Sequence, residues 1–127
     1  METLFLDVNW VAVLVGALAA YALGALWYSE TLFGKKWKAG IGTPAVANMP
    51  MMPGMLTQAI GTLLLACVVG VLETTGSIGL TVLVALTMSV LIKANGFFAG
   101  KAKSAIYIEA SFVLAMVVLM VLAHAVL

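Results

Sequence analysis

Four long apolar stretches, separated by short polar segments, dominate the hydrophobic pattern of this 127-residue chain. They cover about residues 8–28, 55–72, 79–99 and 105–127, and each comes close to the roughly 20 residues that a membrane-spanning helix needs. Within them, polar and apolar positions do not alternate as they would in the strands of a transmembrane barrel. We therefore predict an all-α integral membrane protein, in which a single domain over residues 1–127 forms an antiparallel bundle of four transmembrane helices.

The composition agrees with a membrane protein and excludes several other classes. Hydrophobic residues make up 65% of the chain and charged residues only 9%, against about 45–50% and about 25% in a typical soluble domain. The net charge of +1 offers no dense basic patch for a nucleic acid. The chain has no metalloprotease, P-loop or dinucleotide-binding motif, and its single histidine and single aspartate form no catalytic set with a nucleophile. We therefore expect no enzyme, no cofactor and no metal site.

The lysines indicate how the spans are oriented. Five of them lie in the first and third connections between spans: Lys35, Lys36, Lys38, Lys101 and Lys103. With four spans, these two connections share one side of the membrane, and the other side has no lysine outside the bilayer. Because cytoplasmic loops are enriched in lysine and arginine, we expect both connections in the cytoplasm and both termini outside it. In a bacterium, the location would be the inner membrane.

The first connection, residues 29–54, is the only long one. Its basic part contains Lys35, Lys36, Trp37 and Lys38. We expect these residues at the lipid interface of the cytoplasmic face, with the lysines towards anionic lipids and Trp37 among the headgroups.

The second part of this connection is rich in methionine and proline. Thioethers are ligands that copper(I) prefers, but no cysteine or histidine accompanies Met49, Met51, Met52 and Met55. We favour adaptable apolar contacts of these methionines at the start of the second span. We also expect the prolines to prevent the helix from extending into the connection.

Small residues recur at every fourth position of the first span, at Ala12, Gly16, Ala20 and Gly24. Small residues let the backbones of transmembrane helices approach closely, so Gly16, Ala20 and Gly24 are predicted helix-packing positions. The spacing does not say whether this contact forms within one chain or between copies. We expect a homo-oligomer, because one copy has few helices with which to enclose a water-filled path.

Lys93 and Glu109 are charged residues that the pattern places inside spans. Each such charge costs about 2.5–3.5 kcal/mol on the insertion scale and marks a candidate functional site. Lys93 comes nine residues before the turn near Ala102 and Glu109 seven residues after it, so both lie at nearly the same level and we predict an ion pair. The pair either fixes the register of the hairpin or exchanges a proton or ion during transport. Alternatively, Lys93 snorkels to the interface without a partner.

Three further polar or small residues lie near Lys93 in the third span. Ser89 and Gly96 share the face of the helix that carries the lysine, whereas Asn95 points elsewhere. We expect Ser89, Asn95 and Gly96 to line either a pore or a helix-packing face.

A motif follows the first span, where the stretch Gly24–Trp37 reads GALWYSETLFGKKW. It resembles the pattern G-x-L-W-Y-S-P-x-x-F-G-x-x-W of the DUF1761 family of small bacterial membrane proteins, with Glu30 in place of the proline. Asn95 and Glu109 correspond to a family asparagine and aspartate at the same separation, and Val113 stands where a histidine is frequent. The resemblance covers most of the chain and implies four transmembrane helices, but it implies no established activity.

Two classes of function remain open. One is an oligomeric transporter or channel for a small solute, an ion or a proton, with Lys93 and Glu109 handling the charge. The other is a non-conducting accessory, scaffold or lipid-interacting protein that uses the small-residue stripes and the basic connection. The sequence favours the first class slightly. It does not resemble a small multidrug transporter, which would carry an essential carboxylate in the first span, here uncharged before Glu30.

Overall fold

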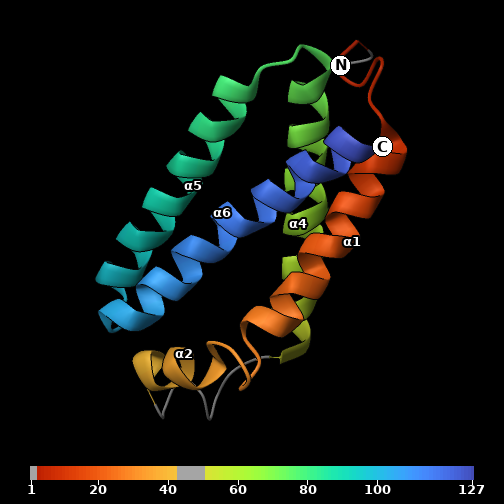
Figure 1. Ribbon diagram of the computed structural model, residues 1–127. Helices are drawn as coiled ribbons and strands as arrows, with labels where there is room; N and C mark the ends of the chain where they lie inside the picture. The colour runs from red at the N-terminus through yellow and green to blue at the C-terminus, as the bar shows by residue number, and fades with distance from the viewer. Residues whose placement is uncertain (1–2, 43–50) are drawn as a thin grey trace.

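The computed structural model describes residues 3–42 and 51–127, which form five α-helices (Figure 1). The helices are α1 (Trp10–Trp27), α2 (Gly34–Ile41), α4 (Met51–Thr74), α5 (Ile78–Phe98) and α6 (Lys103–Val126). All of them except α2 are long and apolar enough to cross a membrane. The predicted all-α fold, with four helices long and apolar enough to span a membrane, is therefore confirmed.

The helix α4 begins earlier than the sequence predicted. It starts at Met51, so that Pro53 lies in its first turn. In the first turn of a helix the backbone N–H groups have no partner within the helix, so a proline there costs no hydrogen bond. The expectation that the prolines would stop the helix is therefore wrong for Pro53. Residues 43–50 of the first connection lie outside the described residues, and with them Met49 of the copper alternative.

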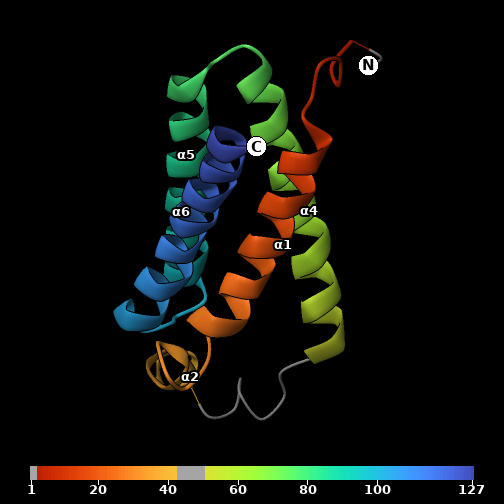
Figure 2. The same ribbon diagram turned by 45° about the vertical axis from the view of Figure 1, so that its right-hand side comes forward.

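The helix α6 lies at the centre of the bundle, where it contacts α1, α2, α4 and α5 (Figure 2). Ten of its residues are buried, against four in each of α1 and α5. Its neighbours approach it through small residues, among them the buried Gly16 of α1 and the buried Ser89 and Gly96 of α5. Because small residues permit close contact between helix backbones, α6 is the scaffold against which the other helices are positioned.

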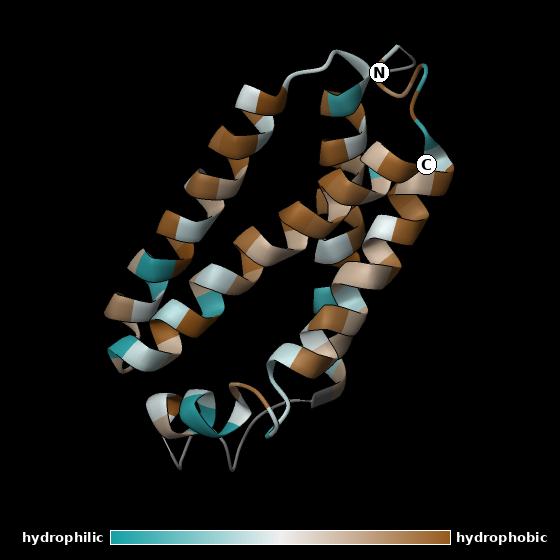
Figure 3. Cartoon of the chain, viewed as in Figure 1, coloured by the Kyte–Doolittle hydropathy of each residue, from teal (hydrophilic) through white to brown (hydrophobic). Residues whose placement is uncertain are grey.

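The short helix α2 lies across one end of the bundle, opposite to the start of α1 and the end of α6 (Figure 1). Hydrophilic residues gather in α2 and in the adjoining ends of α5 and α6, whereas the long helices are mostly hydrophobic along their length (Figure 3). We call this the basic end, because it carries Lys35, Lys36, Lys38, Lys101 and Lys103.

Candidate functional site at the basic end

A tight backbone turn after α1 directs the chain into α2. The amide of Phe33 donates to the carbonyl of Trp27 over 3.1 Å, and the amide of Gly34 donates to the carbonyl of Ser29 over 2.8 Å. A Cβ at Gly34 would overlap the backbone carbonyl oxygen of Tyr28, which cannot move aside as a flexible side chain could. Glycine at position 34 therefore allows the close turn that lays α2 across the end of the bundle.

The far end of α2 rests directly on the start of α6. The carbonyl of Gly40 accepts a hydrogen bond of 3.0 Å from the amide of Ala102, just before α6. A Cβ at Gly40 would lie only 2.5 Å from Cβ of Ala105, so glycine is needed for the two backbones to come this close. Both ends of α2 are thus tied to the bundle through its backbone.

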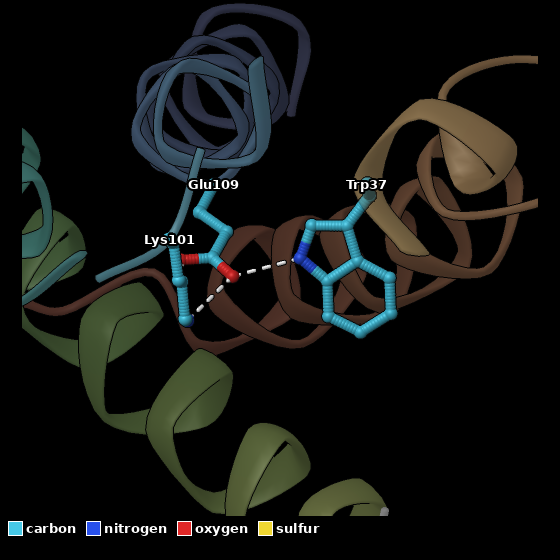
Figure 4. A network of polar contacts seen from close by, with 3 residues as sticks. All are labelled: Trp37, Lys101 and Glu109. Carbon is cyan, nitrogen blue, oxygen red and sulfur yellow. Dashed lines mark hydrogen bonds and ion pairs between the residues drawn. The ribbon is translucent and has the colours of Figure 1, made fainter. Parts of the chain in front are cut away.

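A three-residue polar network joins α2, the α5–α6 turn and α6 (Figure 4). The indole Nε1 of Trp37 donates to Oε2 of Glu109 over 2.7 Å. The ammonium of Lys101 forms an ion pair with the same carboxylate, at 2.8 Å from Oε2 and 3.0 Å from Oε1. Hydrogen bonds to an ionised group are stronger than those between neutral groups. The Glu109 carboxylate is therefore both neutralised and hydrogen-bonded within the chain.

Aromatic side chains from α1, α2 and α6 pack together beside this network. The Trp27 ring lies 4.9 Å from that of Phe33, and the Tyr28 ring meets that of Trp37 edge to face at 5.0 Å. Phe112 of α6 contacts both Trp27 and Tyr28, at 6.0 and 5.4 Å between ring centroids. The indole of Trp27 also donates to the carbonyl of Ile108 over 3.1 Å. Tilted and edge-to-face pairs at these separations are favourable, so the cluster stabilises the docked position of α2.

The predicted ion pair between Lys93 and Glu109 is wrong, because Glu109 pairs with Lys101. The ammonium of Lys93 lies instead over the ring of Tyr107, 5.3 Å from its centroid. Consecutive residues of an α-helix are about 100° apart around its axis, so Tyr107 and Glu109 project from nearly opposite sides of α6. Lys93 and Glu109 therefore lie on different sides of α6.

The three residues expected near Lys93 are divided between the helix interface and the surface. The hydroxyl of the buried Ser89 donates to the carbonyl of Ala110 over 3.2 Å. A Cβ at the buried Gly96 would lie 2.6 Å from Cγ1 of Ile106. Both residues therefore lie in the packing contact between α5 and α6, whereas Asn95 is exposed.

The small residues of α1 lie against α6 within the same chain. A Cβ at Gly16 would lie 3.2 Å from Cα of Met120, and one at Gly24 would lie 3.0 Å from the ring of Phe112. Ala20 is fully buried. The structure thus places Gly16, Ala20 and Gly24 in an intramolecular contact, a choice that the spacing of the residues left open.

Of the residues expected at the lipid interface, Lys35 and Lys36 are exposed and Lys38 is partly buried. The indole of Trp37 turns inward to Glu109 and Tyr28, contacts that the sequence did not predict, and its place at the lipid interface stays a prediction. An amphipathic surface helix can bury its apolar face against lipid or against protein, and here the helix Gly34–Ile41 packs on α6. The hydrophobic pattern cannot distinguish these two partners.

Sequence reasoning missed two members of the network, because it assigned Lys101 to topology and Trp37 to lipid. The motif that ends at Trp37 held the missing signal: its aromatic residues Trp27, Tyr28, Phe33 and Trp37 converge beside α6. In residues 3–42 and 51–127, no three His, Cys, Asp or Glu side chains are grouped so that they could hold a metal ion.

Comparison with known proteins identifies the family. No curated protein and no solved structure matches the chain. A family model described as a protein of unknown function (DUF1761) matches residues 11–125, which is nearly the whole sequence. The chain therefore belongs to the DUF1761 family.

Proposed function

We propose that this protein is a non-conducting, lipid-interacting membrane protein, in which Glu109 fastens α2 to the bundle and α2 presents Lys35 and Lys36 to anionic lipids. The observation that carries the proposal is the engagement of the Glu109 carboxylate by Lys101 and Trp37 of the same chain. Lys35 and Lys36 are exposed on the helix that this contact holds in place. Exposed lysines close to a membrane surface attract anionic headgroups.

The state of Glu109 supports a fastening role more than a conducting one. A carboxylate that carries a proton or ion must exchange its partners during each cycle. Here both oxygens are bonded to groups of the same chain at 2.7–3.0 Å, and the side chain is only 16% exposed. Removing one partner from such a pair leaves a poorly solvated charge. The network is therefore better suited to hold three segments together than to release a charge repeatedly.

The orientation and location form part of the same proposal. We infer that the basic end faces the cytoplasm, that both termini lie outside it and that the membrane is the bacterial inner membrane, because five lysines lie at that end. A reporter enzyme that works only outside the cytoplasm, fused after Leu127, should be active. Cytoplasmic activity of a matched reporter at the same position would contradict this orientation.

Ion flux in proteoliposomes tests the choice between the two classes of function. The purified protein and its Glu109→Gln variant are reconstituted with proton- and potassium-sensitive dyes. Both should match protein-free liposomes, because the proposal assigns no conduction to Glu109. Flux that the wild type supports and Glu109→Gln abolishes, in a variant that still assembles, would contradict the proposal and restore the transport class.

Retention of anionic lipid tests the role assigned to α2. Native mass spectrometry of the detergent-solubilised protein with phosphatidylglycerol should show less bound lipid for Lys35→Gln and for Lys36→Gln. Lys93→Gln is the matched control, since it removes a lysine that packs on Tyr107 of α6. Equal loss in all three variants would contradict a specific role for α2. The homo-oligomer stays a prediction, which the masses of the same complexes test.

A further inference from the structure

A groove of about 500 Å³ lies between α4, α5 and α6, separate from the aromatic cluster at α2. Gln58, Gly61 and Thr62 of α4, Met88 of α5, and Val113 and Met116 of α6 are among the residues that line it. Its volume lies within the range of small-molecule binding pockets, and it is open along one side. The groove exists because α4 and α5 have little contact with each other. The helix α4 packs mainly on α1, and α5 packs mainly on α6.

The lining of the groove suits a hydrocarbon chain. None of its lining residues is charged, and most are apolar. Its amide and one of its hydroxyls are engaged with each other, since Nε2 of Gln58 donates to Oγ1 of Thr62 over 3.1 Å. Both groups also approach the thioether of Met116 at 3.9 Å. An apolar groove in a membrane-spanning bundle offers an ion no charge to replace its hydration. The side chains of Met88 and Met116, in contrast, can adapt to a flexible hydrocarbon chain.

The charged pair described above lies beyond the end of this groove. Glu109, Val113 and Met116 are spaced at four and three residues and so share one face of α6. Glu109 thus follows the groove by about one helical turn, towards the basic end. A chain lying in the groove would place its polar headgroup beside Glu109 and Lys101.

The pair keeps one acceptor site and one donor for such a headgroup. A carboxylate has about four acceptor sites and an ammonium three donors. Among the described residues, Glu109 accepts three hydrogen bonds and Lys101 donates two of these. Lys101 is 30% exposed, so a ligand can reach it. An anion for Lys101 and a cation for Glu109, in neighbouring positions, are the two charges of a zwitterionic phospholipid headgroup.

We propose that the groove binds one acyl chain of a zwitterionic phospholipid such as phosphatidylethanolamine, with the phosphate at Lys101 and the ammonium at Glu109. The site differs in position and in charge from the lysines of α2, and the inference does not depend on their binding of anionic lipid. It assigns a lipid ligand to the groove between α4, α5 and α6.

Gly61 provides a variant that fills the groove directly. In the part of the chain that the structure describes, a Cβ at Gly61 would meet no neighbouring atom within 4 Å, so Gly61→Phe places a ring in the groove without displacing a helix. Gly79→Phe is the matched control, because Gly79 of α5 is equally unobstructed and does not line the groove. Gly61→Leu fills less of the space and gives a graded comparison if the phenylalanine variant is poorly folded.

Native mass spectrometry with equimolar phosphatidylethanolamine and phosphatidylglycerol tests the inference. The wild type and Gly79→Phe should each retain one phosphatidylethanolamine per chain, and Gly61→Phe should lose it by at least about tenfold. Lys36→Gln should retain it, which separates this site from the one on α2. Equal retention by Gly61→Phe and wild type would overturn the inference. It would also be overturned if Gly61→Phe dissociated an oligomer instead, or if the groove preferred phosphatidylglycerol.

Discussion

The two sides of the bundle use similar residues in opposite ways. On the closed side, formed by α1, α2 and α6, a Cβ at Gly16 would lie 3.2 Å from Cα of Met120, and one at Gly40 would lie 2.5 Å from Cβ of Ala105. On the open side, where α4 and α5 face the groove, a Cβ at Gly61 would meet no described neighbour within 4 Å. Glycine thus permits backbone contact on one side and leaves space on the other.

This difference shows that small residues within a span do not by themselves identify a helix contact. Such residues allow close packing, but a second helix must be present to use the space. In this chain α6 occupies the space beside α1, whereas α4 and α5 leave a groove of about 500 Å³. The closed side holds α2 docked on α6, and the open side holds the groove for the proposed acyl chain, which leads to the same Glu109–Lys101 pair.

The largest contrast is expected between Gly16→Leu and Gly61→Leu. The first variant forces a side chain against the backbone of α6 and should lower the free energy of unfolding by about 3 kcal/mol. The second should change it by less than about 1 kcal/mol, because it meets no neighbour and improves helix propensity. Chemical unfolding in detergent micelles measures both. If both variants lowered the free energy of unfolding by similar amounts, the proposed difference between the closed and the open side would be contradicted.

On the closed side, Glu109→Ala should lower the free energy of unfolding by about 2 kcal/mol. It leaves Lys101 and the indole of Trp37 without their shared acceptor, and an unsatisfied group of this kind costs about 1–3 kcal/mol. Hydrogen exchange should rise in α2 (Gly34–Ile41) before it rises in α6. Unchanged exchange in α2 would show that Glu109 does not hold this helix.

Trp37→Phe should have a smaller effect, because it keeps an aromatic ring beside Tyr28 while it removes the N–H donor and one ring of the indole. The expected loss is about 1.5 kcal/mol, the lower end for a hydrogen bond to a charged group. Trp27→Phe is a matched control, since its indole donates to the neutral carbonyl of Ile108 and should cost less. If Trp27→Phe lowered the free energy of unfolding more than Trp37→Phe, the hydrogen bond to Glu109 would not be the stronger of the two.

The smallest change in the free energy of unfolding is expected for Lys93→Met, where α5 contacts Tyr107 of α6. This variant removes the contact between the ammonium and the Tyr107 ring, which is worth about 0.5–1 kcal/mol at an exposed site. Methionine keeps most of the apolar stem. If Lys93→Met lowered the free energy of unfolding as much as Glu109→Ala does, Lys93 would have a structural role as large as that of Glu109, and the account would be contradicted.

The sequence could predict what depends on the length and spacing of apolar residues. Four apolar runs predict four spans. The five lysines of the first and third connections predict that these connections lie at the same end of the bundle. The partner of Glu109 could not be predicted, because it depends on the rotation of α6 about its axis. A rotation that brings Ile106 and Ala110 to α5 directs Glu109 towards α2 and Tyr107 towards Lys93.

The position of α2 and the presence of the groove depend on contacts between helices, which cannot be predicted from a single sequence. The hydrophobic pattern of α2 fits a lipid surface as well as a protein surface, and only the approach of Gly40 to Ala105 shows that it packs on α6. The groove depends on how far α4 and α5 diverge after their tight turn at Gly76, where φ is 66°. Neither feature has a periodic signature along the chain.

A double-mutant cycle between Trp37 and Glu109 tests the central claim most directly, namely that Glu109 fastens α2 to the bundle. The free energy of unfolding is measured for the wild type, Trp37→Phe, Glu109→Ala and the double variant. The account predicts a coupling energy of about 1–2 kcal/mol, as for residues that share a hydrogen bond. Additive effects, with a coupling energy close to zero, would contradict it.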